Sequence, residues 1–527
     1  MTKSPGRTLV IYPLFFGIYP VLALIAHNIA EMPLTAGLRA LSLSLLITLL
    51  LYLVLYYLIE NSFNAALLVS LVVFLFFSYG HLLYLFRETP VLNFSLGRHR
   101  TLAPLYTGLF IIIAAIIQKT KRDLSTLTKF LNAFAIILLI FPIYQILSYQ
   151  VKVVIAEKDQ RRAIAATSAV SLPQDQPAPD VYYILTDGYP RSDFITEYLG
   201  YDNSEFLDNL TSKGFYVAQC SQSNYTDTRF SMASTFNMTY LNNSGDQPRV
   251  DYPKSTLESM INNGTVQQNF YDLGYTIVTF DTGYYWLELE NSAIHLGPTK
   301  KQLNQKIFNI NINDFEYLLL NTTAGKLVLD LPYLLYPDKA EMLAQTIERT
   351  QGSHRHRVLY TLEELPDVAD SIPGPKFVYA HIIFPHPPYI VDANGNRLES
   401  NPQNELTAYG EQIAYLDRRL TEIVDTLLEK SNPKPIIIIQ SDHGASIEYE
   451  LLNIDKSNRL GILNAYYLPR NPSGGNPAAQ LYSTITPVNT FRMIFDQYFN
   501  GNYGLLEDKS IIGSQSPFTT LECSFAE

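Results

Sequence analysis

The chain has 527 residues, of which 47% are hydrophobic, and a formal net charge of −11. This length allows several domains, and the acidic balance argues against nucleic acid as a partner. The first 150 residues are mostly apolar, whereas the remainder has the composition of a globular protein. The sequence therefore predicts a membrane region followed by a folded, more polar region.

Five apolar stretches in the first region are candidate membrane spans, because a helix of about 20 apolar residues crosses a bilayer. The first is not a simple signal peptide, since four more such stretches follow without a cleavage-like end. They are also apolar all round, which suits lipid better than a soluble core. The predicted spans lie near Leu9–Ala26, Leu41–Ile59, Ala65–Leu85, Leu105–Ile117 and Phe130–Ser148.

The charges between these spans give a mixed indication of orientation. Lys3 and Arg7 precede the first span, and a basic stretch at residues 119–129 separates the fourth from the fifth. The positive-inside rule places both in the cytoplasm, so five spans put the C-terminal region outside. Three arginines between the third and fourth spans then lie outside, against the rule. They are Arg87, Arg98 and Arg100.

A polar and then Pro-rich segment separates the two main regions and predicts a linker. We therefore divide the chain into a transmembrane helical domain at 1–150, a linker at 151–179 and a C-terminal domain at 180–527. Both cysteines, Cys220 and Cys523, lie in the last part. A disulfide in an exported domain and two free buried thiols are both compatible with the sequence.

The C-terminal region alternates strand-like apolar runs with amphipathic segments. Between the third and fourth runs, apolar residues from Tyr409 to Leu427 recur every three or four positions, which predicts a helix packed on a sheet. Strand–helix–strand order indicates an α/β domain with a central, largely parallel sheet flanked by helices. The predicted strands are Val181–Leu185, Tyr275–Phe280, Phe377–Phe384, Ile436–Ile439 and Leu463–Leu468.

Polar residues directly follow two of these strands. Asp187 ends the first, and Asp442 with His443 follows the fourth. Open α/β sheets bind ligands at the carboxyl ends of their strands, and carboxylates and imidazoles are metal ligands. The simpler alternative is that Asp187 belongs to an ordinary Asp-Gly turn and that the Asp-His pair arises by chance.

A helix-like pattern begins near Thr228, after a polar stretch. A hydroxyl at a helix N-terminus lies among free backbone N–H groups at the positive end of the dipole, which favours an alkoxide and a bound phosphate. The alternative is that Thr226, Asp227 or Thr228 only caps the helix.

Four histidines raise separate expectations. The prolines around His386 force a rigid, extended loop that can hold its ring toward a substrate phosphate. We expect His381, inside an apolar strand, to be a hydrogen-bonded core residue. We expect His354 and His356, which alternate with arginines, to lie on an exposed face.

Together these residues resemble the alkaline phosphatase/sulfatase superfamily, and especially its membrane-anchored bacterial branch of lipoteichoic acid synthases and phosphoethanolamine transferases. In that branch five N-terminal transmembrane helices carry an extracytoplasmic catalytic domain with an alkaline phosphatase-like fold. The similarity covers the layout and the whole C-terminal domain. The motifs are the strand ending at Asp187, Thr228 with Ser231, the segment 385–389, Ser441–Gly444 and Asn464–Pro469.

The resemblance implies that Asp187, Asp442 and His443 are metal ligands and that Thr228 is a metal-bound nucleophile. It also implies that His386 contacts the substrate phosphate or the leaving group. The metal of the family is usually zinc or manganese, and the ligand set does not choose between them. Phosphoethanolamine transferases carry a further histidine after the Asp-His pair. None follows His443 here, so a single metal is expected.

The sequence departs from the sulfatases that depend on formylglycine. Those enzymes need a Cys or Ser followed by x-Pro-x-Arg, and neither Cys220 nor the Thr228 segment has this pattern. Sulfate-ester hydrolysis is therefore not expected.

The implied function is metal-dependent transfer of a phosphoglycerol- or phosphoethanolamine-type group. The donor is a membrane phospholipid, the intermediate a covalent phospho-threonine, and the acceptor a glycan or lipid hydroxyl outside the cell. The resemblance places the protein as a multi-pass protein of the bacterial inner membrane. The alternatives are a phosphodiesterase or phosphatase on the same site and a non-catalytic membrane-anchored protein of the same fold. The sequence does not indicate an oligomeric state.

Overall fold

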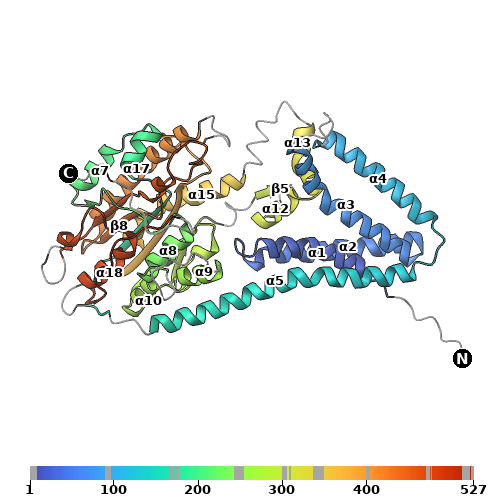
Figure 1. Cartoon of the computed structure of the whole chain (residues 1–527), viewed down its shortest axis with the longest axis horizontal. Coiled ribbons are helices and arrows are strands. Elements are labelled where there is room, and N and C mark those ends of the chain that lie inside the picture. Colours follow the sequence, from blue (N-terminus) through green and yellow to red (C-terminus); the bar gives the residue numbers. More distant parts are fainter. Residues whose placement is uncertain are drawn as a thin grey trace. The chain divides into compact units, whose positions relative to one another are not determined.

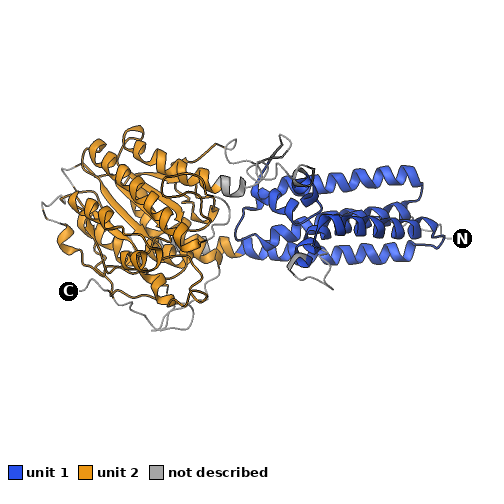
Figure 2. Ribbon diagram, turned by 90° about the horizontal axis from the view of Figure 1, so that it is seen from above, with its two compact units in different colours: residues 1–151, 304–350 blue, residues 152–303, 351–527 orange. Residues whose placement is uncertain are grey.

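The computed structural model describes residues 9–88, 97–165, 170–173, 177–241, 254–299, 305–307, 310–335, 349–398, 404–470, 475, 477–512 and 523. The chain forms two compact units (Figure 2). Unit 1 comprises Met1–Val151 and Asn304–Thr350, and unit 2 comprises Lys152–Leu303 and Gln351–Glu527. The segment 304–350 is thus far from the rest of unit 1 in sequence but belongs to it in space.

Unit 1 is built on five apolar helices (Figure 1). Four of them are long and apolar enough to cross a membrane, and α1 is apolar but has only 16 residues. Large apolar side chains on α2 point outward, with Leu46 50% and Ile47 61% exposed, as expected of a surface that lipid covers. The helices are α1 (Tyr12–His27), α2 (Leu38–Ile59), α3 (Ser62–Glu88), α4 (His99–Lys119) and α5 (Ser125–Ala165).

Helix α5 continues past the change from apolar to polar sequence. The residues from Val151 to Ala165 are rich in Ala, Glu, Lys, Gln and Arg and contain no Gly or Pro, so the local sequence does not end the helix. The predicted boundary at residue 150 therefore falls inside α5.

Between residues 304 and 350, α12 (Asp314–Asn321) packs on the α1–α2 connection and α13 (Gly325–Leu335) packs on α3. The described residues before α12 pair as β5 (Gln305–Ile307) and β6 (Ile310–Ile312). Asn313 and Glu316 form a capping box at the start of α12. Asn313 Nδ2 also donates to the Ala36 carbonyl at 3.0 Å, and Glu316 forms an ion pair with Arg39.

Unit 2 contains a seven-stranded sheet in the order β2-β9-β8-β1-β7-β3-β4. All neighbouring strands are parallel except at β9, which runs antiparallel to both β8 and β2. The predicted fold class and all five predicted strands are therefore confirmed. The strands are β1 (Val181–Asp187), β2 (Tyr216–Val217), β3 (Thr276–Phe280), β4 (Ile294–Leu296), β7 (Lys376–Pro385), β8 (Ile436–Ser441) and β9 (Asn464–Tyr467).

Helices cover both faces of this sheet (Figure 1). Successive side chains of β1 point to opposite faces, so Tyr182 packs with α7, α15 and α17, and Tyr183 packs with α8, α9, α10 and α18. The predicted helix through 409–427 is confirmed as α17. The helices are α6 (Ser192–Phe194), α7 (Ser204–Ser212), α8 (Thr228–Asn237), α9 (Lys254–Asn262), α10 (Thr265–Asp272), α15 (Arg349–Glu364), α16 (Val368–Ser371), α17 (Glu405–Lys430) and α18 (Pro487–Tyr498).

Cys220 and Cys523 are joined by a disulfide bond. Of the two states that the sequence left open, the structure therefore has the bonded one. The bond joins two residues of unit 2 that are 303 positions apart in sequence.

Candidate active site

Three neighbouring strands of unit 2 end at the same edge of the sheet. Strand β1 lies between β8 and β7 and pairs in parallel with both. Asp187 is the last residue of β1, Asp442 and His443 directly follow β8, and His386 directly follows β7. The parallel register therefore brings together residues that are more than 250 positions apart in sequence.

Asp187, Asp442 and His443 form a buried cluster whose ligand atoms all lie within 4.8 Å of one another. His443 Nε2 is 3.7 Å from Asp187 Oδ1 and 3.4 Å from Asp442 Oδ2. His443 Nδ1 lies 2.8 Å from the Gly444 carbonyl, which can only accept, so Nδ1 carries the proton and Nε2 presents its lone pair. An imidazole whose other nitrogen is held by a carbonyl is the usual arrangement of a metal ligand.

The cluster fits a divalent cation. Asp187 Oδ1 and Asp442 Oδ2 are buried and have no hydrogen-bond partner among the described residues. Two carboxylate oxygens and an imidazole lone pair thus face one another, an arrangement that is costly without a positive charge between them. The donor set suits zinc or manganese.

Burial alone would raise the pKa of the Asp187 carboxyl group, but the nearby His386 and His381 hold that pKa well below its usual range. The carboxylate is therefore in the state that binds a cation.

The turn after β1 positions both carboxylates. Gly188 has φ +78°, a backbone conformation that favours glycine, and its N–H donates to Asp442 Oδ1 at 3.1 Å. The His443 N–H donates to the same oxygen at 2.9 Å. The Asp-Gly pair is therefore a turn, as in the simpler alternative, and the turn also brings Asp187 and Asp442 together.

Thr228 is the first residue of α8 and lies beside this cluster. Its Oγ1 is 3.3 Å from His443 Nε2. The neighbouring Asp227 is the N-cap, and its side chain accepts from the Arg229 N–H. The capping alternative thus applies to Asp227, and the Thr228 hydroxyl remains at the positive end of α8, facing the cluster.

His386 lies in the loop that follows β7. Its N–H donates to the Asp187 carbonyl at 3.0 Å, and its ring centroid is 6.5 Å from that of His443. Its Nδ1 is 2.6 Å from the Pro387 carbonyl, which can only accept. Nε2 is therefore the ring nitrogen that can exchange a proton with a substrate.

His381 is buried and its Nδ1 is hydrogen-bonded to the Tyr379 hydroxyl at 3.0 Å, as expected of a core histidine. Its Nε2 lies 3.7 Å from Asp187 Oδ2 and has no hydrogen-bond partner among the described residues. The expected exposed position is wrong for His354, whose burial lowers its pKa to about 4, with further lowering by the nearby His386. Helix α15 turns His354 inward, whereas His356, two residues along, is exposed.

Arg459 is a site residue that sequence reasoning missed. Its Nη2 lies 3.3 Å from His443 Nε2, and its Nε donates to the Thr226 carbonyl at 2.8 Å. The guanidinium is a fixed positive charge beside Thr228 and the cluster, where it can contact a phosphate oxygen. No motif spacing marks this arginine, because only the fold brings it to the site.

The model of the family described as Sulfatase matches residues 179–482, more than half of the chain. The chain belongs to the sulfatase family. Asp187, Thr228, His386, Asp442 and His443 all lie inside the matched range. The superfamily resemblance inferred from the motifs is confirmed, and with its apolar helices the protein is a membrane-anchored, sulfatase-like enzyme.

Several solved structures are similar to this sulfatase-family protein at low identity. The C-terminal periplasmic domain of EptC from Escherichia coli, in complex with zinc, is 9% identical, with a TM-score of 0.40 over 64% of this chain and 87% of that chain. The integral membrane lipooligosaccharide phosphoethanolamine transferase A of Neisseria meningitidis is 12% identical, with a TM-score of 0.34 over 86% and 88%. The lipoteichoic acid synthase LtaP of Listeria monocytogenes is 12% identical, with a TM-score of 0.33 over 60% and 72%. No curated protein matches the chain.

Proposed function

We propose that this protein transfers a phosphoglycerol- or phosphoethanolamine-type group from a membrane phospholipid to a glycan or lipid hydroxyl, through a covalent phospho-threonine at Thr228. The observation that carries the proposal is the place of Thr228 Oγ1, at the start of a helix and 3.3 Å from His443 Nε2. A hydroxyl in this position can act as a nucleophile toward phosphorus. The membrane helices on the same chain favour a lipid donor.

Asp187, Asp442, His443 and the Thr228 hydroxyl would hold one zinc or manganese ion. When bound, the metal supplies the positive charge that lowers the pKa of the hydroxyl and neutralises charge on the phosphate. The positive end of the α8 dipole and the Arg459 guanidinium would stabilise the same phosphate oxygens.

The reaction has two balanced steps. In the first, the Thr228 hydroxyl releases its proton to solvent and Oγ bonds to phosphorus, the bond from phosphorus to the diacylglycerol oxygen breaks, and that oxygen takes up a proton. In the second, the acceptor hydroxyl gives up its proton and its oxygen bonds to phosphorus, the bond from phosphorus to Thr228 Oγ breaks, and Oγ takes a proton back from solvent. His386 Nε2 donates the proton to the leaving oxygen and later takes one from the acceptor.

The proposal places unit 2 outside the cytoplasm of a bacterial cell, next to the inner membrane. Disulfides form and persist in oxidising compartments, and Cys220 is bonded to Cys523. With α1 counted as a fifth span, the helices of unit 1 would carry the chain from a cytoplasmic N-terminus to the opposite side. The disulfide further supports phosphoryl over sulfate chemistry, because Cys220 is not available for conversion to formylglycine.

Labelled phospholipid and purified full-length protein test the proposal. The wild type is expected to gain the mass of the phosphorylated headgroup on the peptide containing Thr228, and Thr228→Ala is expected to lose this adduct and the transfer activity. Thr226→Ala is the matched control, because Arg459 contacts only the backbone carbonyl of Thr226. Undiminished transfer by Thr228→Ala would disprove the nucleophile, and release of free phosphorylated headgroup alone would indicate the hydrolase.

A further inference from the structure

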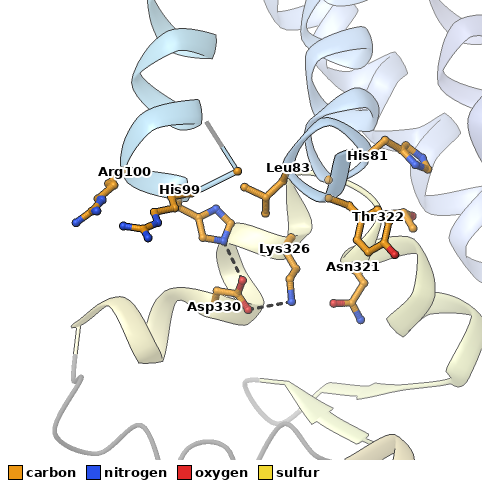
Figure 3. Close-up of a pocket in the computed structure, with 12 residues that line it drawn as sticks. His81, Leu83, His99, Arg100, Asn321, Thr322, Lys326 and Asp330 are labelled. Carbon is orange, nitrogen blue, oxygen red and sulfur yellow. Dashed lines mark hydrogen bonds and ion pairs between the residues drawn. The ribbon is translucent and has the colours of Figure 1, made fainter. Parts of the chain in front are cut away.

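A cavity of about 730 Å³ lies in unit 1, where α3 and the start of α4 meet the α12–α13 segment (Figure 3), and we call it the polar cavity because charged residues contribute to its lining. Its lining includes three residues with permanent positive charge, Arg98, Arg100 and Lys326, and one acid, Asp330. None of the described residues that line it belongs to unit 2, which carries the candidate active site. The two sites therefore share no residue.

Asp330, the one acid among the described lining residues, already has two partners. Asp330 lies 2.8 Å from His99 Nε2 and 3.1 Å from Lys326 Nζ, and Figure 3 shows both side chains directed at it. Within the part of the chain that the structure describes, no ion pair involves Arg98 or Arg100. Both arginines are exposed at the start of α4, where the helix dipole adds positive potential. The cavity therefore attracts an anion.

An apolar cavity of about 850 Å³ adjoins the polar one. It is lined mainly by apolar side chains of α1, α3, α4 and α5, and it shares His81 and Thr322 with the polar cavity. A ligand that fills both needs an anionic head and long apolar chains. Among membrane components, an anionic glycerophospholipid has this combination.

The arginines also explain an irregularity of the sequence. In the five-span arrangement predicted from the sequence, Arg98 and Arg100 lie on the side of the membrane that the positive-inside rule assigns to few basic residues. A phosphate ligand is a reason for arginines to be there, because guanidinium groups bind phosphate with good geometry.

We propose that the two cavities form one binding site for an anionic glycerophospholipid. Its phosphate lies by Arg98, Arg100 and Lys326, and its acyl chains lie between α1, α3, α4 and α5. The site belongs to unit 1 alone and does not depend on the chemistry of Thr228.

Native mass spectrometry of the full-length protein in mild detergent tests the head of the site, with phosphatidylglycerol, phosphatidylcholine and inorganic phosphate as probes. The wild type is expected to hold one phosphatidylglycerol, and the double variant Arg98→Gln/Arg100→Gln is expected to bind it about tenfold or more weakly, the scale of lost contacts to an anionic headgroup. The double variant Lys121→Gln/Arg122→Gln is the matched control. It removes the same charge from the exposed α4–α5 connection and is expected to keep the lipid.

Ser70→Leu tests the apolar part of the site. Ser70 lines the apolar cavity, and its buried hydroxyl has no hydrogen-bond partner among the described residues, so the substitution fills space without breaking a contact. It is expected to weaken binding of phosphatidylglycerol and to leave the melting temperature of the protein unchanged or higher.

Three results would overturn the proposal. Equal affinity for phosphatidylcholine, or an equal loss in the Lys121/Arg122 control, would mean unselective lipid contact. Inorganic phosphate could also bind as tightly as the lipid and lose as much affinity in Arg98→Gln/Arg100→Gln. That result would mean that the protein has a phosphate site and no lipid site. Thr228→Ala is expected to bind phosphatidylglycerol as the wild type does, so failure of the proposed catalytic function is distinguishable from failure of this site.

Discussion

Asp442 has two oxygens in different surroundings. Oδ1 accepts from the N–H groups of Gly188 and His443, whereas Oδ2 is buried, has no hydrogen-bond partner among the described residues and faces His443 Nε2 at 3.4 Å. An asparagine at this position keeps the acceptor and turns an N–H₂ donor toward the imidazole lone pair. It also removes one of two neighbouring buried carboxylates.

Metal removal should therefore lower the stability of the wild type, whereas Asp442→Asn should not lower the stability of the metal-free protein. In the presence of a chelator, the variant is expected to melt at the same or a higher temperature than the wild type. With zinc or manganese added, the wild type is expected to gain stability and the variant to gain little, because binding to the folded state raises stability by mass action. Melting curves with and without metal check this, and a variant that is less stable than the wild type in chelator would contradict it.

Arg459 contributes a charge that no aspartate or histidine of the cluster can replace. Arg459→Ala is expected to lower kcat/KM by roughly 10- to 10²-fold, the scale of a charged hydrogen bond to a phosphate of about 1.5–3 kcal/mol. Steady-state kinetics with the labelled donor lipid measures the loss. The exposed Arg470→Ala is the control, and an equal loss there would assign the effect to overall charge.

At the scale of the element, the turn from Asp187 to Tyr189 connects β1 to the site. A Cβ at position 188 would lie 2.7 Å from the Tyr409 hydroxyl, which donates to the Gly188 carbonyl at 2.7 Å. Gly274 offers a matched comparison, with φ +81° and, among the described residues, no atom within 4 Å of the point where a Cβ would lie.

Gly188→Ala is expected to cost more than Gly274→Ala. Both variants meet the backbone strain of about 1 kcal/mol for a side chain at positive φ, but only the first also displaces Tyr409 and the N–H bond to Asp442. Metal affinity by titration should fall for Gly188→Ala and stay unchanged for Gly274→Ala. Equal affinity in the two variants would show that the turn does not position the ligands.

Helix α17 carries a buried acid, Asp417, that accepts hydrogen bonds from Tyr189 at 2.7 Å and Tyr201 at 3.1 Å. Burial raises its pKa to about 8, and the two hydroxyls lower it only in part. The folded state therefore holds a proton that the unfolded chain releases above about pH 4. This contribution to stability is complete below that pH and is lost as the pH rises toward 8.

Asp417→Asn mimics the protonated form and should flatten this part of the pH dependence. The free energy of unfolding of the variant is expected to change less than that of the wild type between about pH 4 and pH 8, and to exceed it at pH 8. Denaturant unfolding at several pH values measures both. Parallel pH profiles would rule out Asp417 as the titrating group.

At the scale of the whole molecule, the sequence predicts unit 2 better than unit 1. The strands of unit 2 are apolar runs and α17 is periodic, so local patterns suffice, and the parallel order then places Asp187, Asp442 and His386 at one edge. The packing of α12 and α13 on the N-terminal helices depends instead on tertiary contacts such as Asn313 to Ala36, which leave no periodic signal. His354 and Arg459 escaped prediction for the same reason.

The ion pair between Arg39 and Glu316 connects α2 to α12 across 277 positions of sequence. Glu316 is buried and also closes the capping box of α12, so its loss should release the segment that lines the polar cavity.

Glu316→Ala is expected to raise the rate of proteolysis within residues 313–335 in detergent-solubilised protein. Asp314 is an exposed acid in the same turn, and Asp314→Ala is expected to leave that rate unchanged. Arg39→Ala removes the ion pair but keeps the capping box, and should give an intermediate rate. If Arg39→Ala and Glu316→Ala do not differ from the wild type, the segment is held by its other contacts, such as the bond from the Ala324 N–H to the Phe76 carbonyl at 2.8 Å.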